Sequence, residues 1–246
     1  MKKTTATLAA VLLCGATALQ AQSWKPLEQK ALQDEAYARH DCVNLLDSTS
    51  VIVQPTGQGS FAVCRAVKVQ TPAGALRQRV LKYDYDPLTA AARFRRVTIH
   101  HADGTKTEVD VTKTQDYAAP ARAIYWGARQ IMIELGQLKP GDVIDYEIDK
   151  KGFTYALLAD TPQEGDDSRF IPPMRGQFYD IVPFWSSDPT VRKVYRVSLP
   201  ADKDMQFQFY QGSCASSLRY EDGRKVYTFA SDGLMPFQRE PNMVDF

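Results

Sequence analysis

The chain has 246 residues, of which 44% are hydrophobic and 24% are charged, and its formal net charge is +1. These values are ordinary for a globular protein, and an all-β fold of roughly 200–250 residues often forms a single domain. A chain this close to neutrality has no overall field to attract nucleic acid or an anionic membrane, so no nucleic-acid partner is expected.

Residues 1–21 have the pattern of a secretory signal peptide. The charged start Met1–Lys3 is followed by an apolar run over residues 6–19, which is too short to span a bilayer. Small residues offer signal cleavage after Ala18 or after Ala21. No later stretch is apolar and long enough for an integral membrane segment, so we expect a soluble protein exported to the periplasm or the extracellular space.

The cysteines bear on anchoring and on cross-links. Leu13 precedes Cys14 at a position where a lipoprotein signal needs a small residue, so no lipid anchor is expected. The mature chain keeps Cys42, Cys64 and Cys214. In an oxidising compartment these three thiols permit one disulfide, whose pairing the sequence leaves open. Cys64 lies in an alternating apolar run, which is typical of an inert buried cysteine.

One helix is expected near the start of the mature chain, within residues 22–40. From Lys25 to His40 the apolar residues recur at helical spacing, and Pro26 is tolerated near a helix start. These apolar residues are Leu27, Ala31, Leu32, Ala36 and Tyr37. We expect the helix to lie against a sheet.

From Ser48 the apolar period changes to two, which predicts strands. Thr71–Gly74 is interpreted as a turn, and Asp103-Gly104 is a strong hairpin signal. The strands predicted in this half of the chain are Val51–Val53, Ser60–Gln70, Arg77–Tyr85, Arg93–His101 and Lys106–Thr112.

The clearest pattern covers Gln130–Lys150. Ile131, Ile133 and Leu135 share one parity, and the residues from Ile144 repeat the alternation. We predict a pair of half-buried antiparallel strands joined by a type II turn at Pro140, Gly141 and Asp142, with positive φ at the glycine.

The rest of the chain adds short strands and two irregular stretches. Residues 159–176 form a long loop that is either functional or disordered. The strands predicted after it are Gln177–Trp185, Val191–Leu199, Gln206–Gln211, Ser217–Glu221 and Lys225–Ala230. Together these elements predict an all-β fold, a two-layer antiparallel β-sandwich over residues 41–232 with one short N-terminal helix. Residues 233–246 are predicted to be an extended linker or tail toward a missing C-terminal domain.

The order of these motifs resembles a known family. The relevant segments are the helix, a strand pair, Lys82–Asp86, the hairpin at Ala102–Gly104, the segment Leu138–Glu147, Pro183-Phe184 and Val194–Pro200. They resemble the β-sandwich domain of unknown function that precedes a transglutaminase-like domain in exported bacterial proteins, and the likeness spans about residues 41–241. The resemblance implies a transglutaminase-like partner domain that carries a Cys, His and Asp triad, on the same chain in relatives or in trans. No catalytic residue can be carried over, because nothing in this chain matches that triad.

The sequence offers few candidates for catalysis. A cysteine nucleophile needs a base and a group that orients the base. His40 lies two residues from Cys42, and we favour a structural cysteine beside a helix-end histidine over a catalytic pair. His100 and His101 point to opposite faces of a strand, so they cannot both bind one metal from that element, and a solvated histidine is the favoured interpretation.

No cofactor or metal is expected. Carboxylates at Asp84, Asp86, Asp166 and Asp167 lack the spacing of a calcium loop, so strand-edge and loop carboxylates are favoured. Aromatic side chains on an open sheet face could bind a sugar or a protein, but in β proteins they usually pack in the core or pair across strands. These aromatics are Tyr83, Tyr85, Tyr125, Trp126, Phe178, Tyr179, Phe184 and Trp185.

The favoured hypothesis is a non-catalytic, exported module that positions or docks with a transglutaminase-like domain, which is a cysteine protease-like domain. Two alternatives stay open. One is a glycan- or envelope-binding module, and the other is a cysteine-type hydrolase in its own right.

Overall fold

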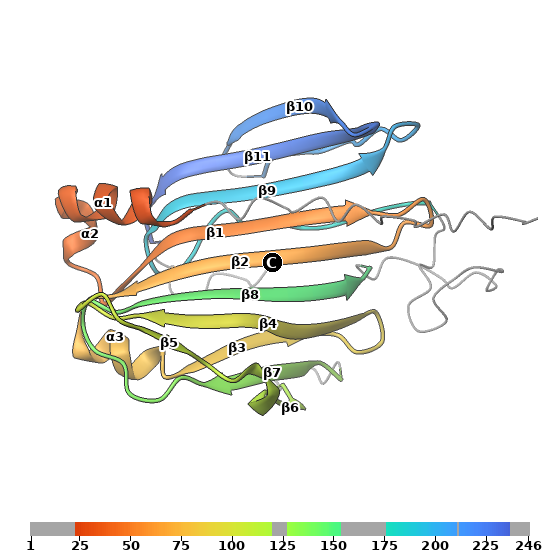
Figure 1. The fold of residues 1–246 in the computed structure, drawn as a ribbon. Coiled ribbons are helices and arrows are strands. Elements are labelled where there is room, and N and C mark those ends of the chain that lie inside the picture. The colour runs from red at the N-terminus through yellow and green to blue at the C-terminus, as the bar shows by residue number, and fades with distance from the viewer. Residues whose placement is uncertain (1–22, 120–126, 154–175, 211, 237–246) are drawn as a thin grey trace, which may run out of the picture.

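Strands dominate the computed structural model, which describes residues 23–119, 127–153, 176–210 and 212–236 (Figure 1). The signal peptide, with Ala18 and Ala21, lies outside these residues. The larger sheet has eight strands in the order β10-β11-β9-β1-β2-β8-β4-β5. Their bounds are β1 Cys42–Val53, β2 Gly59–Val69, β4 Ala90–His100, β5 Lys106–Glu108, β8 Val143–Gly152, β9 Thr190–Pro200, β10 Ala215–Glu221 and β11 Arg224–Leu234.

The smaller sheet has three strands in the order β3-β7-β6, with bounds β3 Val80–Tyr85, β7 Arg129–Glu134 and β6 Gln115–Ala118. The prediction of an all-β sandwich is confirmed. One strand pair departs from the antiparallel pattern, because β1 and β9 run parallel and bring Val51 opposite Val197. Parallel neighbours need a long connection, and more than a hundred residues separate these two strands in the chain.

The predicted pairing of the two strands within Gln130–Lys150 is wrong. β7 belongs to the smaller sheet and β8 to the larger one. Their apolar rows, represented by Ile131 and Ile148, meet in one buried cluster between the sheets. The alternation therefore reports two half-buried strands correctly, but the strands face each other across the core and share no backbone ladder.

The turn between them has the predicted geometry. The Asp142 N–H donates to the Lys139 carbonyl at 3.1 Å, and Gly141 has φ of +96°. Asp142 is buried, and its carboxylate accepts the Lys139 N–H at 2.9 Å and contacts His101 Nδ1 at 3.1 Å. This carboxylate ties the Pro140-Gly141 turn to the end of β4.

Replacing Gly141 with valine is expected to lower the free energy of unfolding by roughly 1–3 kcal/mol, because a β-branched residue is strained at positive φ. A Cβ at this position would also lie 2.9 Å from the Ala102 Cβ. Urea denaturation of the wild type and the variant measures the effect. An unchanged midpoint would contradict the strain at this turn.

The helices differ from the prediction in number. The expected N-terminal helix is two helices, α1 Lys25–Gln33 and α2 Glu35–Ala38, because the Asp34 side chain caps α2 by accepting the Ala36 N–H. The expected turn at Thr71–Gly74 starts a further helix, α3 Pro72–Arg77, whose cap is Thr71, and a short 3₁₀ helix covers Val111–Lys113. A capping threonine before a proline is a helix-start signal that the sequence carries. None of the described helices is long and apolar enough to cross a membrane.

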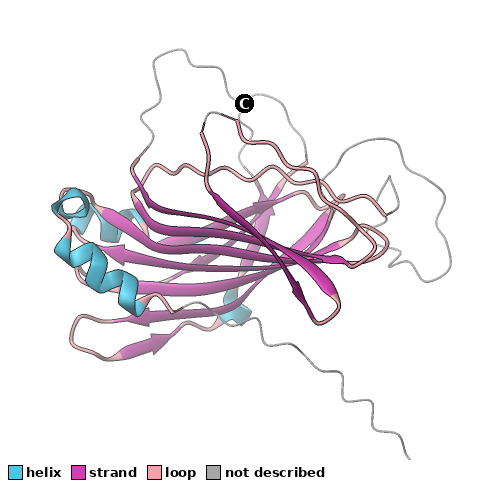
Figure 2. Ribbon diagram, turned by 90° about the horizontal axis from the view of Figure 1, so that it is seen from above, coloured by secondary structure: helices cyan, strands magenta, loops and turns pink. Residues whose placement is uncertain are grey.

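Among the described residues, buried side chains form three clusters on the two faces of the larger sheet. Helix α1 covers one end of what we call the outer face, as Figures 1 and 2 show, and its Ala31 packs in a cluster with Val43 and Ala66. The opposite, inner face carries the other two clusters. One lies beneath the smaller sheet, and the other lies over β1, β9 and β11 around Val197.

The second layer over β1, β9 and β11 has no regular strand in its described part. Residues 177–185 and 206–210 were expected to be strands, but no strand is assigned there. Phe178, Val182 and Phe184 of the first segment pack on the inner face, as does Met205, which directly precedes the second. Every second side chain of residues 177–185 packs on the core, which explains the alternating pattern in the sequence. Such packing does not require the backbone to pair with another strand. At the other end, β11 continues to Leu234, two residues into the predicted tail; residues 237–246 lie outside the description.

Candidate functional site

The outer face carries the one place where a described cysteine and histidine meet several charged groups. The sheet register sets Glu147 of β8 between Cys64 of β2 and Arg96 of β4. Asp145 and His100 lie on the same face. These side chains line a cavity of about 200 Å³ beside the start of α1. We call them the outer-face cluster.

Ion pairs occupy the carboxylates of this cluster. Arg96 contacts Asp145 through both guanidinium ends, at 3.0 Å and 3.3 Å, and contacts Glu147 at 3.0 Å. Although burial opposes the charge of Arg96, the two carboxylates raise its pKa above the ordinary value. Such a bidentate pair fixes both partners, so neither carboxylate is poised to accept a proton as a general base.

His100 lies between a carboxylate and the N-terminal helix. Its Nε2 is 3.7 Å from the Asp145 carboxylate, and its ring meets Trp24 edge to face with centroids 4.9 Å apart. Burial lowers the pKa of His100, and Lys106 and Lys25 add to this effect while Asp145 opposes it. The expectation of a merely solvated histidine is wrong, because His100 fastens the start of α1 to β4.

Cys64 is half-buried, whereas the sequence predicted an inert buried cysteine. Burial, together with the carboxylates of Glu147 and Asp145, raises the pKa of Cys64 to about 11. Only the thiolate is a nucleophile, so this thiol is suppressed at neutral pH. The cluster therefore has the residue types of a cysteine hydrolase without an activated nucleophile.

Alkylation measures this suppression directly. At pH 8 a thiol of pKa about 11 is roughly 0.1% thiolate, so in the folded protein Cys64 should react with iodoacetamide about two orders of magnitude more slowly than in urea. Mass spectrometry of the labelled peptides gives the rate for each cysteine. Equal rates for folded and unfolded Cys64 would contradict the raised pKa.

The candidate disulfide among Cys42, Cys64 and Cys214 is not formed, and all three thiols are free. Cys42 belongs to the cluster beneath the smaller sheet, Cys64 lines the outer-face cavity, and Cys214 packs on the cluster over β11. Because the three cysteines lie in three different places, no two of their thiols are adjacent. Burial raises the pKa of Cys42, whose hydrogen-bonding neighbours are Arg77 and Gln78 in place of His40.

The other predicted polar candidates have local structural partners. His101 binds Asp142 and Thr107, so it diverges from His100 as expected for neighbours on a strand. Asp84 accepts a hydrogen bond from Gln130, and Asp86 accepts the Leu88 N–H. Asp166 and Asp167 lie outside the described residues. No group of three or more His, Cys, Asp or Glu in the described ranges is placed to hold a metal.

The predicted aromatics do not form one open platform. Tyr83 packs against the core, and the Tyr85 hydroxyl donates to Asp116 at 2.7 Å. Phe178 and Phe184 cover the inner face, whereas Tyr179 and Trp185 are 52% and 62% exposed. Tyr125 and Trp126 lie outside the residues that the structure describes. The aromatic residues thus divide between packing and a surface over the second layer.

A charged group that sequence reasoning missed lies inside the sandwich. Asp47 of β1 binds Lys193 of β9 and, at 3.3 Å, Arg65 of β2. Nearby, the Tyr195 hydroxyl donates to Asp180 at 2.6 Å. Asp47 and Arg65 pair across β1 and β2, and Lys193 is the parallel neighbour of Asp47. To predict this group of three charged residues from the sequence, one would have had to predict that β1 and β9 pair in parallel.

Comparison with known proteins gives a family and a fold. Residues 55–238 match the model of a family described as a domain of unknown function with solved structures, DUF3857. A search of curated proteins gives no match. A crystal structure of a candidate protease from Parabacteroides distasonis is 13% identical with a TM-score of 0.62, and the match covers 83% of this chain and 38% of that one.

Two further structures are more distant. An M1 zinc metallopeptidase from Deinococcus radiodurans is 16% identical with a TM-score of 0.35, over 79% of this chain and 40% of that chain. Yeast LTA4 hydrolase in complex with bestatin is 14% identical with a TM-score of 0.38, and the match covers 80% of this chain and 27% of that chain. The chain therefore spans about two fifths or less of the length of these structures. At such TM-scores the last two support no argument about this chain.

Proposed function

Since the chain belongs to the DUF3857 family of domains of unknown function, we propose that it is a non-catalytic, exported module that docks with a transglutaminase-like domain. The leader pattern of residues 1–21 supports export to the periplasm or the extracellular space. The motif order over residues 41–241 supports the identity of the partner. The match with the Parabacteroides distasonis structure covers 38% of that longer chain, which is the proportion of a module within a larger protein.

The observation that carries the non-catalytic part is the state of the outer-face cluster. Its thiol has a pKa of about 11, and Arg96 holds both of its carboxylates. A cysteine hydrolase needs the opposite arrangement, with a thiolate stabilised by a histidinium and an oriented base. The cluster therefore serves to fasten α1 and β4 to β8.

Mixing experiments test the proposal. The mature chain should bind a separately purified transglutaminase-like domain taken from a relative that carries both domains, and saturating amounts should raise the melting temperature by mass action. Serine substitutions at Cys42, Cys64 and Cys214 should leave this binding unchanged. The proposal fails if no binding occurs, or if the chain alone hydrolyses a peptide or ester substrate and loses that activity in the Cys64→Ser variant.

The glycan-binding alternative draws on one observation, the exposure of the Tyr179 and Trp185 rings. Aromatic faces can stack on sugar rings in the same way as they pack against protein. Binding of the mature chain to an array of envelope polysaccharides, lost on replacing both rings with alanine, would favour this function over the docking module.

A further inference from the structure

Exposed hydrophobic side chains gather on one side of the molecule. Among the described residues, thirteen large hydrophobic side chains are exposed, and eight of them fall between residues 179 and 220. These eight are Tyr179, Ile181, Trp185, Phe207, Phe209, Tyr210, Leu218 and Tyr220. Single exposed hydrophobic residues are normal, but a gathered set marks an interaction surface. We call this set the exposed apolar surface.

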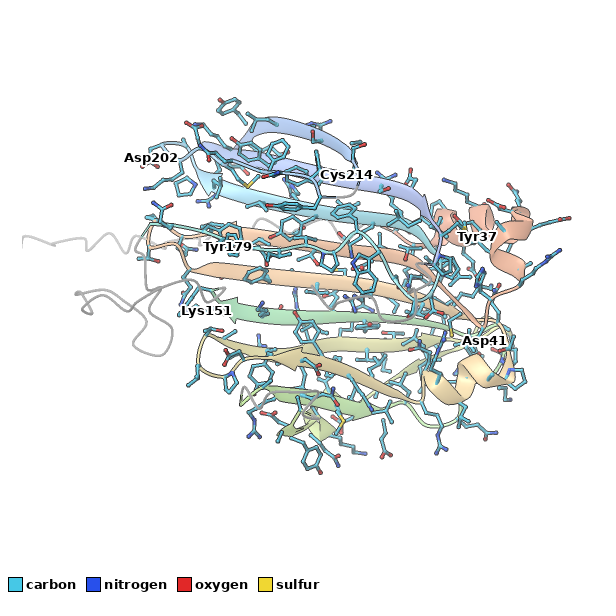
Figure 3. The ribbon with its side chains drawn as sticks, turned by 180° about the vertical axis from the view of Figure 1, so that it is seen from behind. Tyr37, Asp41, Lys151, Tyr179, Asp202 and Cys214 are labelled. Atoms are coloured by element: carbon cyan, nitrogen blue, oxygen red, sulfur yellow. The ribbon has the colours of Figure 1, made fainter. Side chains whose placement is uncertain are left out.

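The segment over residues 177–186 shows that this surface is organised. Its inward side chains are held by contacts with the sheet. The ring centroids of Phe178 and Phe61 are 6.4 Å apart, and the Asp180 carboxylate accepts a hydrogen bond from the Tyr195 hydroxyl. The Lys193 Nζ lies 5.8 Å from the ring centroid of Phe184. The intervening side chains point outward, and three of them are Tyr179, Ile181 and Trp185. Figure 3 shows this side of the sheet, with Tyr179 in front of the middle strands.

The outward positions here differ from those elsewhere in the protein. The outward positions of β8 are Asp145, Glu147 and Asp149, as expected for a strand face in contact with water. The 177–186 segment has the same alternation of burial but places hydrophobic side chains on the outward side. Hydrophobic side chains that face only water add no stability to the fold. Their presence on the outward side is therefore better explained by contact with a partner.

The second part of the surface lies beside the first, over β10 and β11. The rings of Phe207 and Phe209 meet Phe229 of β11, with centroids 4.9 Å and 6.2 Å apart. Leu218 of β10 pairs with Tyr227, which is buried in the same cluster over the inner face. Both parts therefore rest on one core cluster and share one side of the larger sheet.

The size and chemistry of the surface identify the kind of partner. With about 200 Å² for a whole aromatic side chain, its six aromatic residues expose roughly 700 Å². A standard interface between folded proteins buries about 800 Å² on each partner, so the surface fits a folded domain. The aliphatic Ile181 and Leu218 are 73% and 45% exposed and give no ring for a sugar to stack on, which favours a protein over a glycan.

We infer that the exposed apolar surface is where the transglutaminase-like domain docks, through a mainly apolar face of that domain. This inference rests on the proposed function and adds the location of the contact. The aromatic residues, above all Trp185 with Tyr179 and Tyr210, are expected to contribute most of the binding, since Trp and Tyr dominate interface energetics.

Arginine substitutions at the most exposed positions test the location. Ile181, Tyr210 and Tyr220 are 73%, 80% and 71% exposed, so replacing all three should leave folding intact. The triple variant Ile181→Arg, Tyr210→Arg, Tyr220→Arg should bind the separately purified transglutaminase-like domain at least about 100-fold more weakly than the wild type. The matched control Leu88→Arg, at a 76% exposed position outside the surface, should bind within about twofold of the wild type.

The possible results separate the two hypotheses. If the wild type binds and the triple variant binds equally well, the location is wrong and the proposed function stands. If the wild type does not bind, both fail. If light scattering shows wild-type dimers that the triple variant cannot form, or if a polysaccharide array shows binding that it loses, the occupant is a second copy or a glycan, and the inference is overturned.

Hydrogen exchange gives a second measurement that needs no variant. Adding the transglutaminase-like domain to the wild type should slow amide exchange in residues 177–186 and 203–221 and leave β8 unchanged. Protection confined to the outer face, around α1 and β4, would overturn the proposed location even if the triple variant failed to fold.

Discussion

Replacing Asp47 with alanine is expected to lower the free energy of unfolding by about 3–5 kcal/mol, because removing one partner of a buried ion pair leaves an uncompensated charge. The side chain of Lys193 is only 11% exposed and that of Asp47 16%, so neither is well solvated. Without Asp47, the Lys193 ammonium and the Arg65 guanidinium would repel each other on the inner face of the larger sheet. Urea denaturation followed by circular dichroism measures the loss.

The matched control is Asp149→Ala. Asp149 pairs with Arg93 at 2.9 Å on the outer face, where the arginine side chain is 76% exposed. An exposed pair of this kind contributes about 0–1 kcal/mol. Equal losses for the two variants would contradict a special role for the buried pair of Asp47 and Lys193.

The same carboxylate predicts a pH dependence. Burial alone would raise the pKa of Asp47, but Arg65 and Lys193 outweigh it and lower the pKa below the ordinary value. A lowered pKa contributes stability that is fully present above the unfolded value of about 4 and is lost as the pH falls through the folded value. The wild type should therefore lose more stability than Asp47→Ala between pH 5 and pH 2.

Replacing Gly57 with alanine is expected to cost about 3–5 kcal/mol, from strain at positive φ together with overpacking. Gly57 has φ of +92°, and a Cβ there would lie 2.2 Å from the carbonyl oxygen of Gln177. The backbone of Gln177 would have to move, and with it the start of the segment that carries Tyr179 and Ile181. The variant should therefore lose both stability and affinity for the transglutaminase-like domain.

Gly104 supplies the control for this effect. Its φ is +87°, and a Cβ there meets nothing within 4 Å. Gly104→Ala thus carries the backbone strain alone, which costs about 1–3 kcal/mol, and should leave binding unchanged. If the two alanine variants have the same denaturation midpoint, the close approach of Gly57 to Gln177 contributes nothing to stability.

For the candidate sites, the sequence supplied residue types and the structure supplied their neighbours. Cys64, His100 and Asp145 come from three strands, and only the order β2-β8-β4 brings them together. The raised pKa of Cys64 depends on carboxylates about eighty residues away in the chain. No local pattern encodes such a cross-strand neighbour, because register is a property of the whole sheet.

The exposed apolar surface shows the same division. The alternation of Gln177–Trp185 is visible in the sequence and predicts two faces for this segment. Which face is buried, and that the outward one is also apolar, follows only from its packing over β1 and β9.

By itself the sequence determined the alternating segments, the Pro140-Gly141 turn and the Asp103-Gly104 hairpin, because each depends on side-chain parity or on local backbone preference. It also carried the cap of α3, in Thr71 and Pro72. Only the tertiary structure decided that β7 and β8 lie in different sheets, that β1 and β9 run parallel, and that Asp47 meets Lys193. Those features are contacts between residues distant in the chain, and their energy depends on the core that both strands share. A short apolar alternation fits either sheet equally well until that core is assembled.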